Sequence, residues 1–384
     1  MPDLPGVLSA DDIRVTVASI AAEQEGSGAI PWYAGGQLDP WDHVEAAMAL
    51  DVGGETQRAA DAYEWLRRTQ RADGSWASRY ENGVVADATA ETNHAAYLAV
   101  GCWHHFLCTG DDDFLARMWP SIRAALDFVT GCQAPGGEIW WAAGDEVALL
   151  TGSSSIHQAL RCGVAIADRA GEPQPDWDLA ADLLAQAIRK HATKKHASEK
   201  HTTERHATDK DATEKDPAER DATDKDPIRK HAIGGHPAFA DKDRFSMDWY
   251  YPVLGGALRG EPARQRLQQR WDEFVVPGRG ARCVSDRPWV TGAETCELAL
   301  ALDTVGDRDA ATELVAAMQH LREPDGSYWT GLVLTDGVRW PVERTTWTAA
   351  AVVLAVDALH AAHPRSEIFR TPGFAGEVAA NHSR

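Results

Sequence analysis

One glutamate in this sequence stands where helix capping does not explain it, and it is therefore a candidate for acid–base chemistry. Glu343 follows the run Trp340-Pro341-Val342, so no Ser, Thr or Asp lies three residues earlier to share a capping box with it. Arg344 follows directly, and a neighbouring guanidinium favours the ionised form of a carboxylate. An ionised carboxylate can accept a proton, so Glu343 is predicted to act as a general base.

A second pair of acids has the properties of a proton donor. Asp145 and Glu146 follow Trp140 and Trp141 and precede the next predicted helix by several residues, so capping explains them poorly. An acid beside indole rings has a raised pKa and keeps its proton near neutral pH. One of these two acids is therefore predicted to be the general acid.

Three further carboxylates lie at predicted helix starts, where a structural role competes with substrate binding. The run Asp39-Pro40-Trp41-Asp42 has the pattern of an N-cap, an N1 proline and a first-turn acid. Glu294 follows Thr291 at the spacing of a capping box, and Asp248 comes two residues after Ser246. Asp42, Asp248 and Glu294 remain candidates for binding a ligand from these positions.

Ten of the fifteen tryptophans fall in or beside one class of connection between predicted helices. A single tryptophan near a helix start is more often core than binding surface, but a cluster at one end of a fold indicates a ligand-binding face. His94 and His157 fall inside helices and are interpreted as core or wall residues. The aromatic residues predicted to bind substrate are Trp32, Trp41, Trp76, Trp140, Trp141, Trp249, Tyr250, Trp329 and Trp340.

The elements that must position these residues are twelve helices in six hairpins. Six predicted helices are amphipathic, which is typical of half-exposed helices, and six are apolar nearly all round, which is typical of buried ones. Strict alternation of the two kinds predicts an all-α (α/α)6 toroid, one domain over 1–384, with its long loops at the ligand-binding end. The amphipathic segments are 11–24, 55–70, 113–131, 176–190, 262–275 and 307–321, and the apolar ones are 41–50, 91–108, 153–168, 247–258, 292–303 and 344–361.

Residues 190–234 interrupt this alternation with pentads of the form Lys/Arg–His/Asp–Ala–Thr–Asp/Glu. A five-residue period gathers no apolar face on a helix, and prolines interrupt the segment, so a mostly disordered insertion is predicted. Its histidines recur every five residues rather than at a chelating spacing, so no metal site is expected there. A flexible tail is predicted over 365–384.

Bulk composition narrows the class of protein. A net charge of −20 and a pI near 5.1 argue against nucleic acid or an anionic membrane surface as a partner. No apolar run is long enough to cross a bilayer. The six cysteines show no C-x-x-C spacing and no paired-loop pattern, so reduced thiols and a cytoplasmic location are expected. No cofactor or metal is expected, and the partner is expected to be a carbohydrate or another small-molecule substrate. The oligomeric state is open.

The helix pattern and one passage resemble a known group. The stretch 109–129, which runs Thr-Gly-Asp-Asp-Asp-Phe-Leu and ends Ala-Leu-Asp-Phe-Val, is similar to a passage common in the six-hairpin, (α/α)6-toroid glycosidases of the glucoamylase type. Segments 152–156 and 343–349 occupy the places where the sixth and twelfth helices of that group begin. A looser likeness links 70–76 and 323–329 to repeats of the terpenoid-cyclase and prenyltransferase toroids.

The resemblance implies a glycoside hydrolase that inverts the anomeric centre, with a carboxylic acid and a carboxylate on opposite sides of the bound sugar. In the glucoamylase-type pattern the acid comes from the loop before the sixth helix and the base from the loop before the twelfth. Those loops hold Asp145 and Glu146, and Glu343, respectively. The tryptophan-glutamate-glutamate acid motif of that pattern is absent from this sequence.

Two other hypotheses remain open at this point. Aromatic-lined toroids of the cyclase type stabilise carbocations, but the acid cluster Asp111-Asp112-Asp113 lies in a short turn on the opposite rim from the tryptophans. A zinc-dependent prenyltransferase would need a Cys, and Cys296 near Glu294 is a weak candidate. The third hypothesis is a glycan-binding toroid without catalytic activity.

Overall fold

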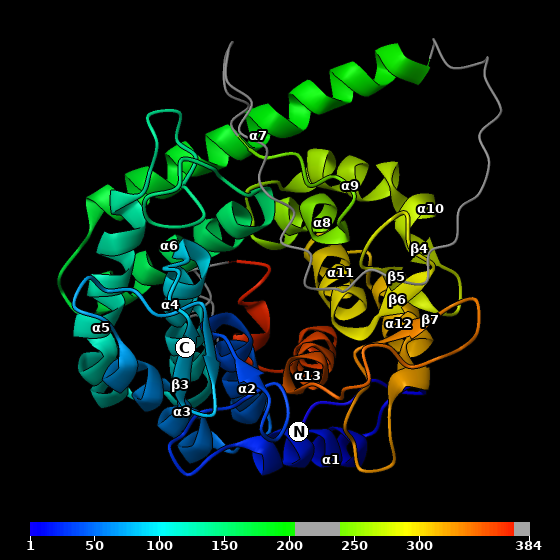
Figure 1. The fold of residues 1–384 in the computed structure, drawn as a ribbon, viewed down its shortest axis with the longest axis horizontal. Coiled ribbons are helices and arrows are strands. Elements are labelled where there is room, and N and C mark those ends of the chain that lie inside the picture. The colour runs from blue at the N-terminus through cyan, green and yellow to red at the C-terminus, as the bar shows by residue number, and fades with distance from the viewer. Residues whose placement is uncertain (204–238, 372–384) are drawn as a thin grey trace, which may run out of the picture.

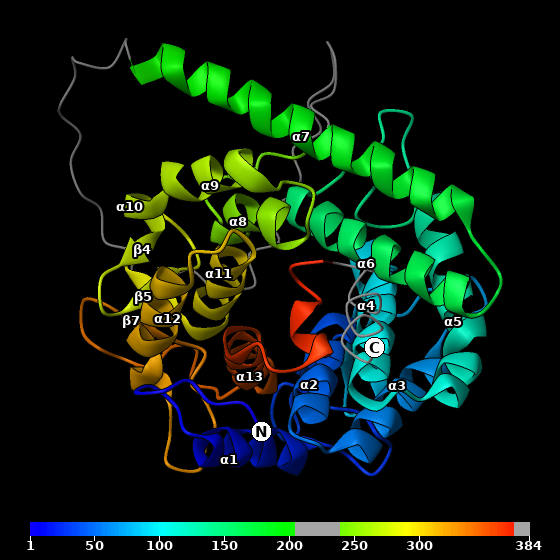
Figure 2. The ribbon, with the colours of Figure 1, turned by 180° about the vertical axis from the view of Figure 1, so that it is seen from behind.

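The computed structural model describes residues 1–203 and 239–371, with the side chains of 193–203 left aside. Figure 1 looks down a ring of six inner helices, and Figure 2 shows the same ring from behind. Neighbouring inner helices pack against one another, and α13 packs against α2, so the ring closes. The inner helices are α2 (Pro40–Val52), α4 (Thr92–Thr109), α6 (Leu150–Arg169), α8 (Ser246–Leu254), α11 (Gly292–Thr304) and α13 (Thr346–His360).

An outer layer of helices surrounds this ring and covers it from solvent (Figure 1). This arrangement confirms the (α/α)6 toroid that the alternating pattern predicted. The predicted outer helix over 262–275 is divided in two, because Arg270 leaves helical geometry between α9 and α10. The outer helices are α1 (Ala10–Glu23), α3 (Thr56–Thr69), α5 (Asp112–Gly131), α7 (Pro175–Thr203), α9 (Gly260–Gln269) with α10 (Trp271–Phe274), and α12 (Arg308–Ala317) with the 3-10 turn η1 (Gln319–Leu321).

Burial follows the two kinds of pattern found in the sequence. Every residue of α11 from Gly292 to Asp303 is buried, and α13 is buried on all sides except at its ends. Outer helices bury one face only; in α3 that face is Ala59, Ala62, Tyr63, Trp65 and Leu66. Hydrophobic burial of the inner ring is thus what holds the toroid together.

A repeated turn ties successive outer helices together. The Gln70 amide donates to the Gly74 carbonyl in its own turn and to the Ser121 carbonyl of α5, and Gln133 repeats this with Gly137 and Ala180. Gly74 has φ of +90°, and an added Cβ would lie 2.1 Å from the Ala124 carbonyl oxygen, so only glycine is tolerated there. The segment 70–76, one of the two that resemble cyclase repeats, therefore serves to pack the outer helices α3 and α5 together.

Short strands occupy the long loops at one end of the toroid. One antiparallel sheet has the order β1 (Gln37–Leu38), β2 (Arg79–Glu81), β3 (Val84–Asp87). The other is antiparallel in the order β4 (Val275–Val276), β5 (Gly280–Arg282), β6 (Trp289–Thr291), β7 (Gly331–Val333). Both sheets sit just before the starts of inner helices, so the amino-terminal ends of these helices form the long-loop rim.

The opposite end of the ring is covered by the segment that includes η2 (Pro364–Glu367). Arg365 pairs with Asp357 at the end of α13, and Arg370 pairs with Asp303 near the end of α11 at 2.6 Å. The expectation of a flexible tail is therefore wrong for 365–371, because these arginines neutralise buried carboxylates. Residues 372–384 lie outside the described residues.

The pentad segment also departs from its prediction. Helix α7 continues to Thr203, so the repeat is helical over 190–203. Its alanines extend a helix whose first half is already nucleated by packing, which removes the main cost of helix formation. The remaining pentads, 204–234, lie outside the described residues. In the described parts of the chain, no helix is both long enough and apolar enough to span a membrane.

Candidate active site

Five carboxylates lie in the first two turns of two inner helices or at their caps. Asp39, Asp42 and Glu45 belong to α2, and Glu294 and Glu297 belong to α11. The charge of Glu297 contributes to the raised pKa of Asp42, and the charges of Glu45 and Glu294 contribute to that of Glu297. These mutual effects indicate that the carboxylates of α2 and α11 lie near one another.

Asp42 is the carboxyl group with the clearest proton-donor character. Asp39 caps α2 as predicted, accepting hydrogen bonds from the amides of Trp41 and Asp42, each at 3.0 Å. The Trp32 indole also donates to Asp39, at 2.9 Å. Burial, followed by the negative charge of Asp39, raises the pKa of Asp42 well above its ordinary value. Burial and the charge of Asp39 thus favour the protonated form of Asp42.

Glu45, one turn further along α2, is held by two aromatic donors. The Trp41 indole donates to Glu45 at 3.0 Å, and the Tyr97 hydroxyl donates to the same oxygen at 3.2 Å. Burial raises the pKa of Glu45 to about 7, against the lowering effect of these two hydrogen bonds. The Trp41 ring in turn lies against Tyr97 and edge-on to Tyr251, so Glu45 helps to fix the aromatic wall.

Glu297 holds the corresponding position on α11. The hydroxyls of Tyr250 and Tyr251 both donate to its carboxylate, the second at 2.5 Å. Burial, and then the charge of Glu45, raises the pKa of Glu297 well above its ordinary value. With both oxygens engaged, Glu297 orients the two tyrosines at the centre of the ring.

Glu294 differs from Glu297 because one of its oxygens has no partner. Thr291 makes no capping hydrogen bond with its side chain, so the predicted capping box of Glu294 is wrong. Instead, Thr295 donates to the Thr291 carbonyl. Among the described residues nothing donates a hydrogen bond to Glu294 Oε2, although the residue is only 8% exposed. Burial and the charge of Glu294 raise the pKa of the nearby Cys283 thiol well above its usual range.

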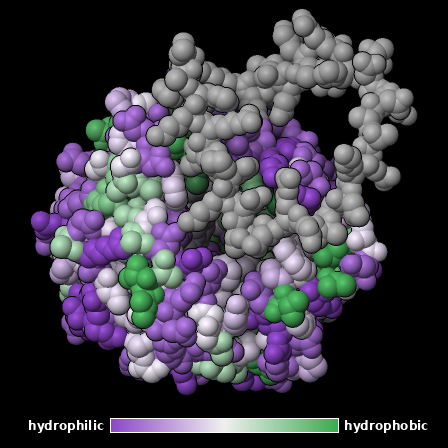
Figure 3. All heavy atoms as spheres, in the orientation of Figure 1, coloured by the Kyte–Doolittle hydropathy of each residue, from purple (hydrophilic) through white to green (hydrophobic). Residues whose placement is uncertain are grey.

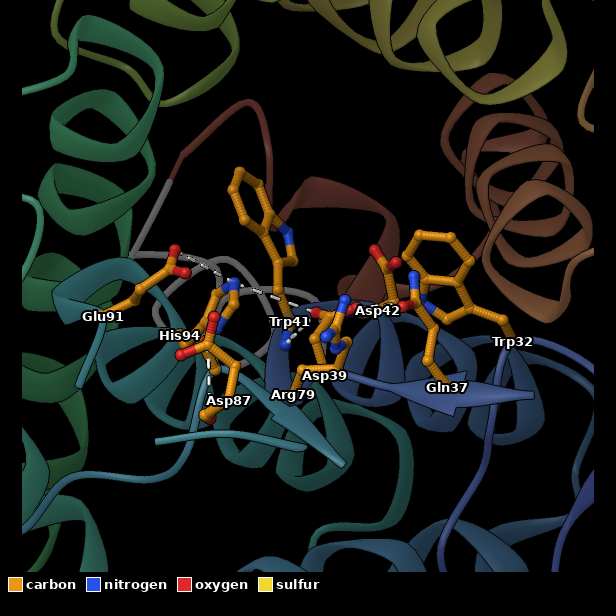
Figure 4. A pocket seen from close by; sticks show the side chains of 10 residues that line it. Trp32, Gln37, Asp39, Trp41, Asp42, Arg79, Asp87, Glu91 and His94 are labelled. Carbon is orange, nitrogen blue, oxygen red and sulfur yellow. Dashed lines mark hydrogen bonds and ion pairs between the residues drawn. The ribbon is translucent and has the colours of Figure 1, made fainter. Parts of the chain in front are cut away.

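A cavity of about 350 Å³ is lined by two of these carboxylates, Asp39 and Asp42, whereas Glu45, Glu294 and Glu297 are not among its lining residues. Trp32, Trp41, Asp42, Glu91 and His94 line it together with Gln37, Asp39, Ser78, Arg79 and Asp87. Figure 4 shows the side chains of Trp41, Asp42 and Glu91 pointing toward the centre of the helical ring. His94 Nε2 lies 3.6 Å from Glu91, and its Nδ1 is a buried atom without a partner in the described structure. Trp32 packs edge-on against Trp347 of α13. Indole rings beside carboxylates suit the apolar faces and the hydroxyls of a sugar.

Several residues predicted to bind substrate are core instead. Trp76 and Trp249 are each 1% exposed, and their indole nitrogens donate to the backbone carbonyls of Leu66 and Arg266. Tyr250 is fully buried. The rings of Trp76 and Trp249 fill space beside the outer helices α3 and α9, where a bulky apolar side chain is most stabilising, whereas Tyr250 is buried against Glu297.

The predicted proton donors lie in the loop between α5 and α6. Trp141 donates to Asp145 at 3.1 Å, and Glu146 is exposed. The loop contacts the start of α4 through its backbone. Ala142 forms a β-bridge with Glu91, and the carbonyl of the half-buried Trp140 accepts a hydrogen bond from the Thr92 hydroxyl. Neither acid lines the cavity beside Asp42.

Glu343 lines a different cavity, between α1 and the loop before α13, together with Trp329. The structure therefore does not bring Glu343 together with Asp145 or Glu146.

Trp340 packs edge-on against Trp289 at the sheet of β4–β7. Asp248 is buried and accepts a hydrogen bond from Thr151 at 2.7 Å, which joins the starts of α6 and α8.

The sequence reasoning missed Glu45, Glu297 and Tyr97. A signal was present: Asp42 and Glu45, like Glu294 and Glu297, are three residues apart, so each pair lies on one face of an inner helix.

His157 is a core histidine as expected; burial lowers its pKa to about 4, and it contacts the Gly255 carbonyl.

Among the described residues, one group could offer three ligand atoms to a metal: Asp51, His104 and Cys108. It lies at the carboxyl ends of α2 and α4, at the other end of the ring from the cavity. His105 Nδ1 already lies 2.8 Å from Asp51, and burial raises the pKa of the Cys108 thiol well above its usual range. This group plays no part in the site.

An aromatic-lined cavity with carboxylates in its wall, at the long-loop end of an α/α toroid, is the site of a carbohydrate-active enzyme, and the comparisons with known proteins agree. The chain is 52% identical over 375 residues to an MMP endo-(1,4)-3-O-methyl-α-D-mannosidase from Mycolicibacterium hassiacum, covering 96% of this chain and 92% of that protein. It belongs to the family of that enzyme and is a glycoside hydrolase. No known family model matches the chain.

Solved structures confirm the fold. A glycosidase variant in complex with glucose has a TM-score of 0.64 at 16% identity, over 92% of this chain and 99% of that one. A D-mannose isomerase has a TM-score of 0.58 at 11% identity, again over 92% and 99%. The identity to the mannosidase confirms the glycoside hydrolase hypothesis from the sequence.

Proposed function

We propose that this enzyme hydrolyses internal α-(1,4) linkages in a polysaccharide of 3-O-methyl-D-mannose. The proposal is supported by identity to the mannosidase along almost the whole chain. It is also supported by the composition of the cavity, where indole rings stand beside acids that can bind the few free hydroxyls of a methylated sugar.

Asp42 acts as the general acid in this proposal. It protonates the oxygen of the leaving sugar while the bond from the anomeric carbon to that oxygen breaks. The single observation that carries this assignment is the place of Asp42 in the lining of the cavity, where burial and the adjacent Asp39 also raise the pKa of its carboxyl group. Trp32 holds Asp39 in place, so the capping residue of α2 also maintains the proton on the catalytic acid.

Glu294 acts as the general base. Its unpartnered Oε2 can take a proton from a water molecule as that water attacks the anomeric carbon from the opposite face. Its place in the first turn of α11 puts the carboxylate at the positive end of a helix dipole, which stabilises the negative charge. Attack by water inverts the configuration and requires carboxyl groups roughly 6.5–9.5 Å apart.

This pair departs from the glucoamylase-type arrangement that the sequence resemblance implied. There, acid and base come from the loops before the sixth and twelfth helices, whereas Asp42 and Glu294 lie in the first turns of α2 and α11. Glu45 and Glu297 act as positioning residues, since Glu45 holds Trp41 of the cavity wall and Tyr97, and Glu297 holds the buried Tyr250 and Tyr251.

A cytoplasmic location is part of the proposal. No disulfide joins any two of the six cysteines, and four of them are buried. Unpaired thiols are stable in a reducing compartment, and secreted proteins of this kind more often form disulfides.

The test is hydrolysis of 3-O-methylmannose oligosaccharides by D42N and E294Q. Each variant is expected to lower kcat at least about a hundredfold, the lower end of what general acid–base catalysis contributes, and to leave substrate binding in place. Proton NMR of the wild-type reaction is expected to show the β-anomer as the first product.

E313Q, on the exposed face of α12, is the matched control and is expected to keep wild-type kcat. An E294Q variant with wild-type turnover, together with loss of turnover in E343Q, would refute the assignment of the base. Release of the α-anomer first would refute inversion.

A further inference from the structure

A second, larger cavity lies beside the proposed active site and takes no part in the chemistry above. It has a volume of about 670 Å³ and lies between α1, Tyr33 and the two segments 325–329 and 342–349, so it is named here the α1 cleft. A cavity of this size is within the range of small-molecule binding sites, about 300–1,000 Å³.

The α1 cleft collects exposed apolar side chains. Val342 is 83% exposed, Val15 is 39% exposed and Tyr33 is 37% exposed, and all three line this one cavity. Single exposed apolar residues are common, whereas a gathering of them around a hollow indicates binding. On the face shown in Figure 3, apolar groups lie in patches among polar ones.

The orientation of Tyr33 is fixed by a neighbouring glycine. The Tyr33 ring lies over Gly36, where an added Cβ would approach the ring to 2.8 Å. A flat ring held on the surface in this way presents one face to the cleft, and such a face suits the C–H side of a pyranose ring.

Two carboxylates in the cleft can accept hydrogen bonds from a ligand. Glu23 Oε2 is a buried atom with no hydrogen-bond partner in the described structure, and Glu23 lines the cleft. Glu343 is half-buried and accepts only a long hydrogen bond of 3.4 Å from Thr330. A buried acceptor without a donor is destabilising, so a ligand hydroxyl that donates to it gains binding energy.

The cleft and the proposed active site share a wall. Trp32 lines the active-site cavity, and Tyr33, the next residue, lines the cleft. The Trp32 carbonyl accepts a hydrogen bond from Thr346, a cleft residue at the start of α13. A linear ligand that occupied both cavities would cross this wall.

We propose that the α1 cleft binds sugar units of the same polysaccharide chain, beyond the linkage that is cleaved. Val15, Val342 and Tyr33 contact O-methyl groups and ring faces, and Glu23 and Glu343 accept hydrogen bonds from the free hydroxyls. Glu343 thus serves in binding rather than as the base. This inference rests on the proposed function, because it assumes a long, partly methylated chain as the substrate.

The test compares two substrate lengths, a tetrasaccharide and a chain of more than ten 3-O-methylmannose units. Y33A and V342D each change an exposed side chain and are expected to fold. Both variants are expected to raise KM for the long chain at least fivefold and to change KM for the tetrasaccharide less than twofold. Neither variant is expected to change kcat on either substrate. V338S, at an exposed valine in the same loop but outside the cleft, is the control and is expected to change neither KM.

If the variants change KM equally for the two substrates, or do not change KM for the long chain, the α1 cleft is not a binding site. Hydrolysis by the wild type would in that case still uphold the proposed function. A wild-type enzyme that cleaves neither substrate would instead refute the proposed function, and the cleft proposal with it.

Discussion

Replacing Glu45 with Gln is expected to change how the stability of the enzyme depends on pH. Burial raises the pKa of Glu45 from 4.5 to about 7 in the folded protein. Between these two values the folded state holds a proton that the unfolded state has released, so ionisation favours unfolding as pH rises. The contribution of Glu45 to stability therefore falls with increasing pH through this window.

The size of the effect follows from the shift itself. One pKa unit corresponds to about 1.4 kcal/mol, and a group that titrates at 4.5 unfolded and at about 7 folded loses about 2.5 kcal/mol of stability between pH 5 and pH 8. Gln has no such titration, and its amide oxygen can still accept from Trp41 and Tyr97. E45Q should therefore gain about 2.5 kcal/mol relative to the wild type over the same range.

The assay is urea unfolding of both proteins at pH 5, 6, 7 and 8. The informative quantity is the difference between the two, because other groups change the pH dependence of both alike. Burial lowers the pKa of His43 and that of His157 to about 4, and their contribution to stability rises with pH, opposite in sign to that of Glu45. A free-energy difference between E45Q and the wild type that stays constant from pH 5 to pH 8 would refute the reasoning.

Three other outcomes are expected. Because Asp42 must be protonated to act as the acid, kcat should fall as pH rises through its raised pKa, and a pH–rate profile without an alkaline limb would contradict that role. W76A should lower the free energy of unfolding, measured with urea, by about 3–5 kcal/mol, because it removes a fully buried indole ring and its hydrogen bond to the Leu66 carbonyl. A loss below 1 kcal/mol would argue against a core position for Trp76. R370A should lower the free energy of unfolding by about 3 kcal/mol, because the buried carboxylate of Asp303, which is 4% exposed, would then have an ion pair with Arg308 alone. Thermal unfolding measures the effect. An unchanged Tm would show that the segment 365–371 does not close the ring.

The sequence by itself determined the architecture. Helices that are apolar on all faces, such as α13, can be stable only inside, and helices with one apolar face can only cover them, so the alternation of the two kinds specifies a two-layer ring. The same pattern placed the long aromatic loops at one end. Local signals such as the Asp39 cap and Pro40 were also read correctly, because a cap depends only on residues within one turn.

The tertiary structure decided which acids share the site. The sequence pointed to Glu343, Asp145 and Glu146 because nothing local explained them, whereas Asp42 and Glu294 had a local explanation as first-turn acids. Local sequence cannot tell whether a first-turn carboxylate on an inner helix faces its own backbone or the centre of the ring. That depends on the rotation of each helix against its neighbours, and packing across the whole ring sets that rotation.

The tryptophans show the same division. Their position at one end was evident from the sequence, yet Trp76 and Trp249 fill the core while Trp32 and Trp41 line the cavity. An indole ring has the same preference for an apolar contact whether that contact is a neighbouring helix or a ligand. Only the closure of the ring, which leaves some rings beside empty space and covers others, separates the two roles.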